Sequence, residues 1–155
     1  MSQKKILVID FDLTILTQNN PRELLEENIH LLLEKANSNG ILVFISSRNP
    51  PFIVHDNLKK YNLSKFFKKI IVDYRPKSYH IKQILWELKI ERIEPLYVVF
   101  VDDFLENCII VSILSENLCV KTFSIRYKKR YPNNLENIID LMIENDYYSL
   151  GNIGI

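Results

Sequence analysis

The chain has 155 residues, which fits one domain of ordinary size and is enough to bury a substantial core. Hydrophobic residues make up 47% of the chain and charged residues 25%, a balance that excludes a disordered or fibrous protein. The net charge of +1 gives no strong overall field toward nucleic acid or an anionic membrane, so any basic binding surface has to be local. We expect residues 1–155 to form a single domain.

Cysteine usage and the N-terminal residues both indicate an intracellular protein. The only two cysteines, Cys108 and Cys119, lie in apolar runs, where a free thiol commonly acts as a small buried hydrophobe. A disulfide framework or a zinc site is therefore not expected. The first apolar run is interrupted by Asp10 and Asp12, too early for a signal peptide or a membrane span. We expect a cytoplasmic protein with no membrane partner.

Short apolar runs rich in branched residues alternate with segments of helical spacing along the chain. The runs suit strands buried on both faces of a parallel sheet, and the spaced segments suit amphipathic helices. In chain order, the predicted strands are residues 6–9, 41–45, 70–72, 97–101 and 119–123, and the predicted helices lie around 24–33, 53–58, 81–88, 108–114 and 135–142. Pro21 and Gly40 are the expected boundaries of the first helix.

This alternation predicts an α/β fold, a doubly wound three-layer sandwich with a mainly parallel five-stranded sheet. In such sheets, ligands bind beyond the carboxyl ends of the strands, near the point where the strand order reverses. The informative polar residues all lie directly after predicted strands: Asp10 and Asp12 after the first, Ser46, Ser47 and Arg48 after the second, Asp102 and Asp103 after the fourth. The sequence therefore predicts a site at this edge of the sheet.

Two of these strand ends carry paired acids, which predict a site for a hard divalent cation. Asp10 and Asp12 follow the strand in ILVIDFDLTIL, and Asp102 and Asp103 follow the strand in VVFVDDFLEN. A buried carboxylate is costly without a partner. Mg²⁺ needs only one or two protein carboxylates, because phosphate oxygens and water complete its shell. The two acidic strand ends can bracket one Mg²⁺ ion.

These segments also resemble the motifs of the haloacid dehalogenase (HAD) superfamily. ILVIDFDLTIL is similar to its first motif, a strand followed by Asp-x-Asp-x-Thr, and VFVDDFLEN is similar to its fourth. ILVFISSR and YRPKSYHIKQIL resemble the second and third, with Lys77 at the start of a helix. Order and spacing agree over roughly residues 5–125. The most similar branch is that of the magnesium-dependent phosphatases. Three features carry this resemblance: the serine-arginine pair, the spacing of three residues between Lys77 and His80, and the Asp-Asp pair followed by Asn107.

The resemblance implies a HAD-like Rossmannoid fold and a Mg²⁺-dependent phosphatase that hydrolyses phosphomonoesters. Asp10 would attack phosphorus to form an aspartyl-phosphate. Asp12 would protonate the leaving oxygen and then deprotonate the attacking water. Lys77 and a hydroxyl, from Ser46 or Ser47, would bind the phosphoryl oxygens as charge develops.

The implied metal ligands leave one choice open. Mg²⁺ would be held by Asp10, by the backbone carbonyl of Asp12, and by an acid from the pair Asp102 and Asp103. Asp103 is the direct ligand if Asn107 supports it from the following helix, and Asp102 would then hold the lysine or a metal-bound water.

The implied substrate contacts leave a second choice open. The hydroxyl of the second motif belongs to Ser46 if it comes from the first polar residue after the strand, and to Ser47 if it comes from the serine beside Arg48. Thr14 and Arg48 are further expected contacts to the substrate.

HAD-superfamily members carry cap insertions either after the first motif or between the second and third. Here residues 15–40 hold little beyond one helix, and the stretch of residues 63–77 is shorter still, so little sequence is left for a cap over this site. A minimal or absent cap favours a bulky or exposed phosphorylated substrate, whether a small molecule, a protein or a nucleic-acid end. The segment from Arg126 to Tyr131 mixes basic and aromatic residues that could bind nucleic acid, or it is a solvated turn. The alternative functions are a nucleic-acid 3′-phosphatase and a non-catalytic HAD-fold regulatory module.

Overall fold

The computed structural model describes residues 2–146 and contains a five-stranded, fully parallel sheet with the strand order β3-β2-β1-β4-β5. Its strands are β1 (Ser2–Ile9), β2 (Leu42–Ser47), β3 (Lys69–Val72), β4 (Ile93–Asp102) and β5 (Thr122–Arg126). Its α-helices are α1 (Ile29–Ser38), α2 (Pro51–Lys60), α3 (Lys77–Ile90), α4 (Leu105–Ser115) and α5 (Leu135–Glu144), and η1 (Ser64–Phe66) is a short 3₁₀ turn. The predicted doubly wound α/β class is confirmed.

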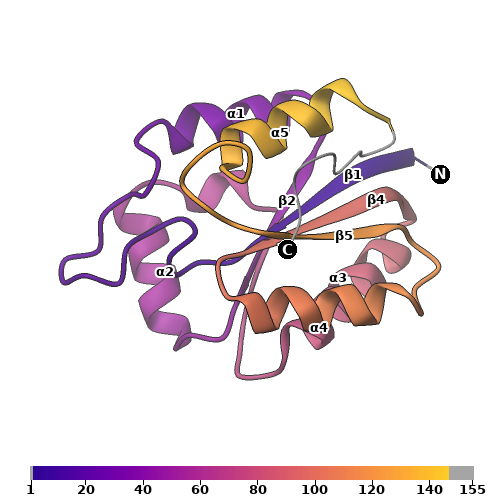
Figure 1. Cartoon of the computed structure of the whole chain (residues 1–155), viewed down its shortest axis with the longest axis horizontal. Helices are drawn as coiled ribbons and strands as arrows, with labels where there is room; N and C mark the ends of the chain where they lie inside the picture. The colour runs from indigo at the N-terminus through magenta and orange to yellow at the C-terminus, as the bar shows by residue number, and fades with distance from the viewer. Residues whose placement is uncertain (1, 147–155) are drawn as a thin grey trace.

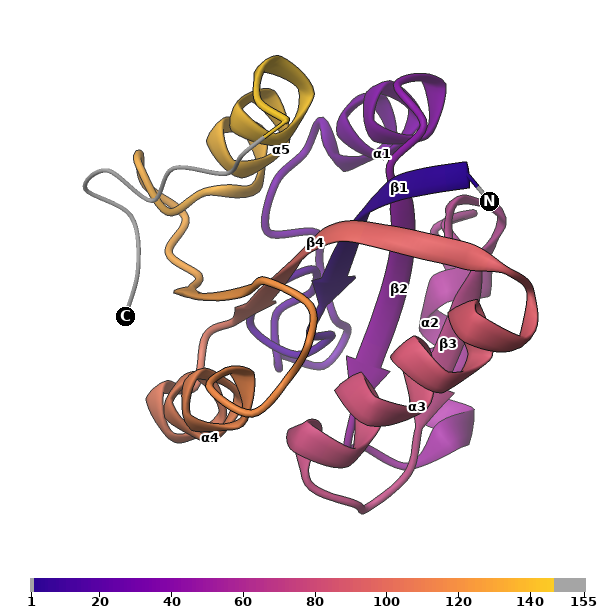
Figure 2. The same ribbon diagram turned by 90° about the vertical axis from the view of Figure 1, so that its right-hand side faces the viewer.

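Helices cover both faces of the sheet, as Figures 1 and 2 show. Alternate residues of β1 explain the two layers: Leu7 and Ile9 pack in the cluster with α1, α2 and α5, whereas Ile6 and Val8 pack in the cluster with α3 and α4. Within residues 2–146, no helix combines the length and the apolar character that a membrane crossing requires.

The strand order reverses at β1. From β1 the chain moves outward through β2 to β3, and it then returns to the other side of β1 to add β4 and β5. Ile9 pairs with Val101, so β1 and β4 end side by side. The ligand crevice of a doubly wound sheet lies at such a point.

The first helix begins later than the sequence pattern indicated. Leu24 lies in an isolated bridge with Leu16, and the Leu25 N–H donates to the Ile15 carbonyl at 3.0 Å, so this stretch is held as a loop against the chain that leaves β1. Pro21 therefore lies outside α1, and its predicted role at the helix start was wrong. Gly40 does follow the helix end, with a left-handed φ of +76° that favours glycine.

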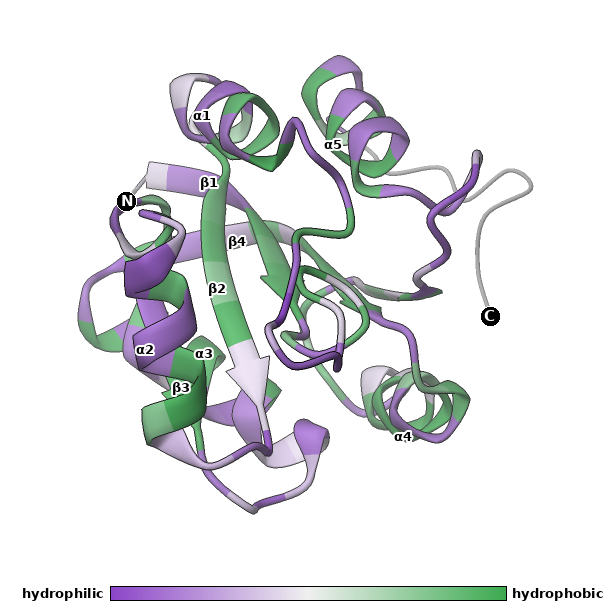
Figure 3. Ribbon diagram, turned by 90° about the vertical axis from the view of Figure 1, so that its left-hand side faces the viewer, coloured by the Kyte–Doolittle hydropathy of each residue, from purple (hydrophilic) through white to green (hydrophobic). Residues whose placement is uncertain are grey.

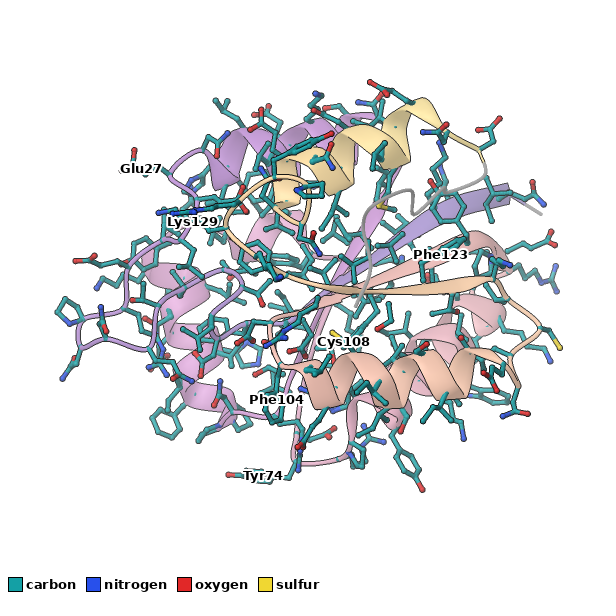
Figure 4. The ribbon with its side chains drawn as sticks, in the orientation of Figure 1. Glu27, Tyr74, Phe104, Cys108, Phe123 and Lys129 are labelled. Carbon is teal, nitrogen blue, oxygen red and sulfur yellow. The ribbon has the colours of Figure 1, made fainter. Side chains whose placement is uncertain are left out.

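The last strand lies three residues later than predicted, at Thr122–Arg126 instead of 119–123. Its register is fixed by β4, with Val98 opposite Thr122 and Asp102 opposite Arg126. Cys119 is consequently exposed in the turn before the strand, which corrects the expectation that both thiols are buried. Cys108 is buried as expected, between α4 and the sheet in Figure 4, and burial raises the pKa of its thiol to about 12.

Candidate active site

A cleft of about 290 Å³ opens at the carboxyl ends of β1 and β4, where the strand order reverses. In Figure 3 the mostly hydrophilic connection between β1 and α1 lies in front of this edge of the sheet. The cleft is lined by acidic, basic and amide side chains together with two apolar ones: Asp10, Asp12, Leu13, Gln18, Arg48, Asn49, Lys77, Asp102, Asp103, Phe104 and Asn107. Six of the nine predicted site residues line it.

A tight turn brings both acids of the first motif to the cleft. The Ile15 N–H donates to the Phe11 carbonyl at 3.0 Å, and Leu13 adopts a left-handed φ of +58°. This turn buries the Phe11 ring in the core and leaves Asp10 and Asp12, on either side of it, at the cleft wall. The Asp-x-Asp spacing thus lets two carboxylates face one ligand.

Lys77 links the ends of three strands through one buried ammonium group. It is the first residue of α3 and only 2% exposed. Its Nζ lies 2.7 Å from Asp10 Oδ1 and 3.2 Å from Asp102 Oδ2, and it donates to the backbone carbonyl of Ser46. Burial opposes the charge on Lys77, but attraction to Asp10 and Asp102 outweighs burial and raises the pKa of Lys77. The ammonium therefore stays charged.

The two acids that follow β4 have different surroundings. Asp102 is fully buried, and its carboxylate accepts hydrogen bonds from the Phe104 N–H at 2.9 Å, from the Asn107 amide at 3.0 Å and from Lys77. Both of its oxygens are thus engaged. Asp103 is half-buried and lines the cleft, and the Arg126 side chain donates to its backbone carbonyl at 3.2 Å.

A cation fits between these acids. One carboxylate oxygen from each of Asp10, Asp102 and Asp103 can be chosen so that all three lie within 4.8 Å of one another. Burial raises the pKa of Asp10 well above its ordinary value, Lys77 opposes this effect, and Asp102 reinforces it. Burial also raises the pKa of Asp103. Since one ammonium does not balance three carboxylates, and all the donors are hard oxygens, the residues present fit Mg²⁺.

The predicted residues after β2 divide between the core and the cleft. Ser46 is fully buried and faces α3, where its hydroxyl lies 2.7 Å from His80 Nδ1. Ser47 is also fully buried, and its hydroxyl accepts a hydrogen bond from the Asn49 N–H at 3.1 Å. Arg48 lines the cleft and donates to the backbone carbonyl of Tyr74 at 3.2 Å. The choice between the two serines stays open.

Thr14 also lies beneath the cleft surface. It is buried, it is not among the cleft-lining residues, and its hydroxyl oxygen has no hydrogen-bond partner within residues 2–146. Its contact to a substrate stays a prediction.

Three residues that sequence reasoning missed surround Asp12. The Arg22 Nε donates to Asp12 Oδ1 at 3.1 Å, the Asn49 amide to Asp12 Oδ2 at 2.5 Å, and the Gln18 amide to Asp12 Oδ2 at 3.5 Å. Asn49 directly follows Arg48 and could have been proposed from its place after β2. Arg22 and Gln18 belong to the loop before α1 and had no such signal.

A family model described as "Protein of unknown function (DUF705)" matches residues 1–83, more than half of the chain. The chain belongs to the DUF705 family. No curated protein matches its sequence.

Solved structures share the fold of this DUF705 protein. A HAD-superfamily hydrolase from Ehrlichia chaffeensis superposes with a TM-score of 0.66 at 14% identity, over 94% of this chain and 100% of that chain. The N-terminal part of the Bacteroides fragilis protein BF1531, which contains a phosphatase domain and is complexed with Mg, gives a TM-score of 0.62 at 16% identity, over 94% of this chain but only 41% of that one.

A third similar structure is the 3-deoxy-D-manno-octulosonate 8-phosphate phosphatase from Moraxella catarrhalis, in complex with a magnesium ion, a phosphate ion and KDO. Its TM-score is 0.56 at 12% identity, over 91% of this chain and 86% of that chain. These likenesses establish that the DUF705 protein has the HAD fold, as the motifs predicted.

The basic segment of the DUF705 protein divides between core and surface. Tyr127 is buried, and its hydroxyl donates to Glu26 at 2.9 Å, so its ring is not available for stacking on a ligand. The side chains from Lys128 to Tyr131 are exposed. Figure 4 shows Lys129 in the loop after β5, at the same end of the molecule as Glu27. Since β5 ends beside Asp102, this loop follows the same edge of the sheet as the cleft.

Proposed function

We propose that this DUF705 protein is a Mg²⁺-dependent phosphomonoester hydrolase that acts through an aspartyl-phosphate on an exposed or bulky phosphorylated substrate. The observation that carries the proposal is the position of Asp10. Its carboxylate borders the cleft, is paired with the buried Lys77 ammonium, and lies beside Asp103. A nucleophile, a fixed positive charge and a cation-binding acid thus converge at one point of an open cleft.

In the first half-reaction, an Asp10 carboxylate oxygen attacks phosphorus, and the bond from phosphorus to the ester oxygen breaks. Asp12 gives a proton to that leaving oxygen, so the product departs as an alcohol. Arg22 and Asn49 hold the Asp12 carboxylate in place. Because the two acids are only two residues apart on one tight turn, their relative position is set by the backbone and not by a mobile loop.

In the second half-reaction, water attacks the phosphorus of the aspartyl-phosphate, Asp12 takes the proton of that water, and inorganic phosphate leaves. This returns Asp10 and Asp12 to their starting states. Lys77 stabilises the negative charge that develops on the phosphoryl oxygens in both steps. Its ammonium is held by Asp102 and the Ser46 carbonyl, so little reorganisation is needed during the reaction.

Asp10, Asp103 and the backbone carbonyl of Asp12 are the groups that would hold Mg²⁺. The engagement of both Asp102 oxygens supports Asp103 as the direct ligand, with Asp102 and Asn107 as its support. When bound, Mg²⁺ supplies positive charge that offsets the repulsion between a carboxylate and an anionic phosphate.

The rim of the cleft supports a bulky substrate. Leu13 and Phe104 are exposed on it and Arg48 lies in its wall, so an apolar group and an anionic group can be contacted together. The connection between β1 and α1, residues 10–28, contains isolated bridges but no helix or strand, so it adds no cap domain over the site and leaves room for a phosphate carried on a larger molecule.

Hydrolysis of p-nitrophenyl phosphate with and without Mg²⁺ tests the proposal. Wild type should turn over only with Mg²⁺, Asp10→Asn should be inactive with its fold intact by circular dichroism, and Asp56→Asn, an exposed acid on α2, should match wild type. A folded wild-type protein that is inactive on this ester and on a panel of phosphorylated peptides, sugars and oligonucleotides would overturn the proposal and favour a non-catalytic regulatory module.

A nucleic-acid 3′-phosphatase is a second candidate. The specific observation in its favour is the exposed basic loop from Lys128 to Tyr131, which follows the edge of the sheet that carries the cleft. Exposed lysines would bind phosphate groups by charge, and the exposed Tyr131 ring could stack on a base. Binding of a 3′-phosphorylated oligonucleotide that is lost in Lys128→Glu with Lys129→Glu, but kept in Lys59→Glu with Lys60→Glu, would support it. Equal binding by both pairs would exclude this loop.

A further inference from the structure

The outward side of α3 carries large apolar side chains. Ile81, Ile84 and Leu88 face the sheet, as expected for a helix of this layer. On the opposite side of the helix, Tyr79, Trp86 and Ile90 share one face and are exposed to solvent. A helix that packs on a sheet by one face usually presents polar residues on the other.

The neighbouring helix α4 repeats this pattern. Cys108 and Val111 are buried, while Ile109, Ile110 and Ile113 are exposed. The two helices pack against each other and cover the same face of the sheet, as Figures 1 and 2 show. Their outward sides therefore form one region. We call it the α3–α4 surface and define it by its six apolar residues: Tyr79, Trp86, Ile90, Ile109, Ile110 and Ile113.

The α3–α4 surface gathers much of the exposed apolar area of the protein on two helices. Its six side chains are between 41% and 64% exposed, and they make up half of the twelve exposed large hydrophobic residues found within residues 2–146. They present roughly 500 Å² of apolar area, which lies in the range of the largest apolar patch on a typical monomer. If two such surfaces met, they would bury about 1,000 Å² of apolar area before their polar rim is counted, which reaches the size of a specific interface.

The charges around the surface are arranged by helix. On α3 the exposed charges without a salt bridge are Lys82 and Lys89, since the exposed C-cap Glu91 is paired with Lys68 at 2.8 Å, and on α4 they are Glu106 and the C-cap Glu116. None of the four forms a salt bridge within residues 2–146. An isologous two-fold contact that sets α3 of one copy against α4 of the other places lysines opposite glutamates twice.

We propose that the α3–α4 surface is the interface of a symmetric homodimer. A second copy is the favoured occupant, because one surface carries both the apolar area and the two unpaired charge sets of opposite sign that a self-complementary contact needs. None of the six apolar residues of this surface lines the cleft at the strand ends. The proposal does not depend on the catalytic function proposed above.

Sedimentation velocity of the full chain over a range of concentrations tests the proposal. Wild type should sediment as a dimer that dissociates on dilution. Trp86→Glu with Ile113→Glu should be monomeric at every concentration, with unchanged circular dichroism. The matched control is Leu31→Glu, an exposed leucine on the outer side of α1, which should remain dimeric like wild type. A wild type that is monomeric at all concentrations, or a dimer that survives the double substitution, overturns the proposal.

Charge reversal tests the α3-to-α4 pairing and separates it from non-specific association. Lys82→Glu with Lys89→Glu should weaken the dimer by tenfold or more, since glutamates would then oppose glutamates. Adding Glu106→Lys and Glu116→Lys in the same chain should restore it. If the chain with all four charges reversed stays as weak as the first variant, the proposed pairing is wrong. A dimer that is insensitive to all of these charge changes but is abolished by Trp86→Glu would also overturn the proposed pairing of α3 with α4.

Discussion

The ammonium of Lys77 lies 2.7 Å from a carboxylate oxygen of Asp10, although the two residues are 67 positions apart in the chain. Asp10 directly follows the central strand β1, and Lys77 begins the helix that leads to the neighbouring strand β4, so the parallel topology brings the two residues together. Both side chains are almost completely removed from solvent. A buried charge of either sign is unfavourable alone, and this pair therefore links the stability of the fold to the chemistry of the cleft.

Lys77→Met is expected to destabilise the protein and to remove its activity. Loss of the ammonium leaves Asp10 and Asp102 facing each other without a positive charge, at a cost of about 3 kcal/mol in the free energy of unfolding. Turnover should fall about 100-fold or more, because the fixed charge on the phosphoryl oxygens is lost. Urea unfolding and steady-state kinetics check both effects, with Lys59→Met on the exposed side of α2 as the control.

The same pair permits a double-mutant cycle. Asp10→Asn combined with Lys77→Met should cost less stability than the sum of the two single changes, because each single change already breaks the ion pair. Additive costs would contradict the interaction.

Asp102→Asn and Asp103→Asn are expected to change different properties of the protein, stability in the first variant and Mg²⁺ affinity in the second. Asp103→Asn should raise the Mg²⁺ concentration needed for half-maximal activity about tenfold or more with little change in stability, because it removes a ligand. Asp102→Asn should lower stability, because both of its oxygens accept hydrogen bonds. Thermal unfolding with and without Mg²⁺ provides a readout that is independent of turnover, and Asp103→Asn should lose most of the Mg²⁺-dependent rise in Tm. The reverse pattern would assign the metal to Asp102.

Arg22→Ala is expected to slow turnover without loosening the fold. Its guanidinium holds Asp12 from a loop whose own position is fixed by backbone hydrogen bonds. Loss of this charge-assisted contact should lower kcat about tenfold, and Asn49→Ala should act in the same direction. The comparison is Arg130→Ala, an exposed arginine in the loop after β5. Unchanged kcat in Arg22→Ala would show that Asp12 is placed without this contact.

His80 is expected to make stability depend on pH between neutrality and mild acid. Burial lowers the pKa of His80, although its hydrogen bond to Asp73 opposes the effect. Below its ordinary pKa near 6.5 the unfolded chain takes up a proton that the folded protein resists, so stability present above that pH is lost as the pH falls. The free energy of unfolding, measured by urea at pH 7.5 and 5.5, should decrease less in His80→Gln than in wild type. His55→Gln, an exposed histidine, should follow wild type; equal slopes in all three would contradict the prediction.

The sequence was sufficient for the fold class because parallel strands buried on both faces require continuous apolar runs. The side chains of Ile6 to Ile9 are fully buried, and only a strand covered on both faces removes four consecutive apolar residues from water in this way. The acids of the site were found for a related reason, since Asp10 and Asp102 end such runs abruptly and a carboxylate in that position needs a partner. The ion pair between Asp10 and Lys77 then follows from topology.

The boundaries and the side-chain partners could not be read in the same way. Leu24 fits the helical spacing of α1, but its pairing with Leu16 holds it in a loop. The same loop carries Arg22, whose side chain reaches Asp12 at the cleft. The direction of Ser46 depends on which face of β2 it occupies, which a one-residue shift in register reverses. Its hydroxyl faces His80 in the helical layer.

In the proposed mechanism, Asp10 carries the phosphoryl group of the intermediate. The most direct measurement is rapid acid quenching of wild type during turnover of an aryl phosphate, followed by mass spectrometry of the digested protein. We expect the added mass of one phosphoryl group on the peptide that contains Asp10, present with Mg²⁺ and absent in Asp10→Asn. A phosphoryl group found on another residue, or turnover that continues at the wild-type rate in Asp10→Asn, would contradict it.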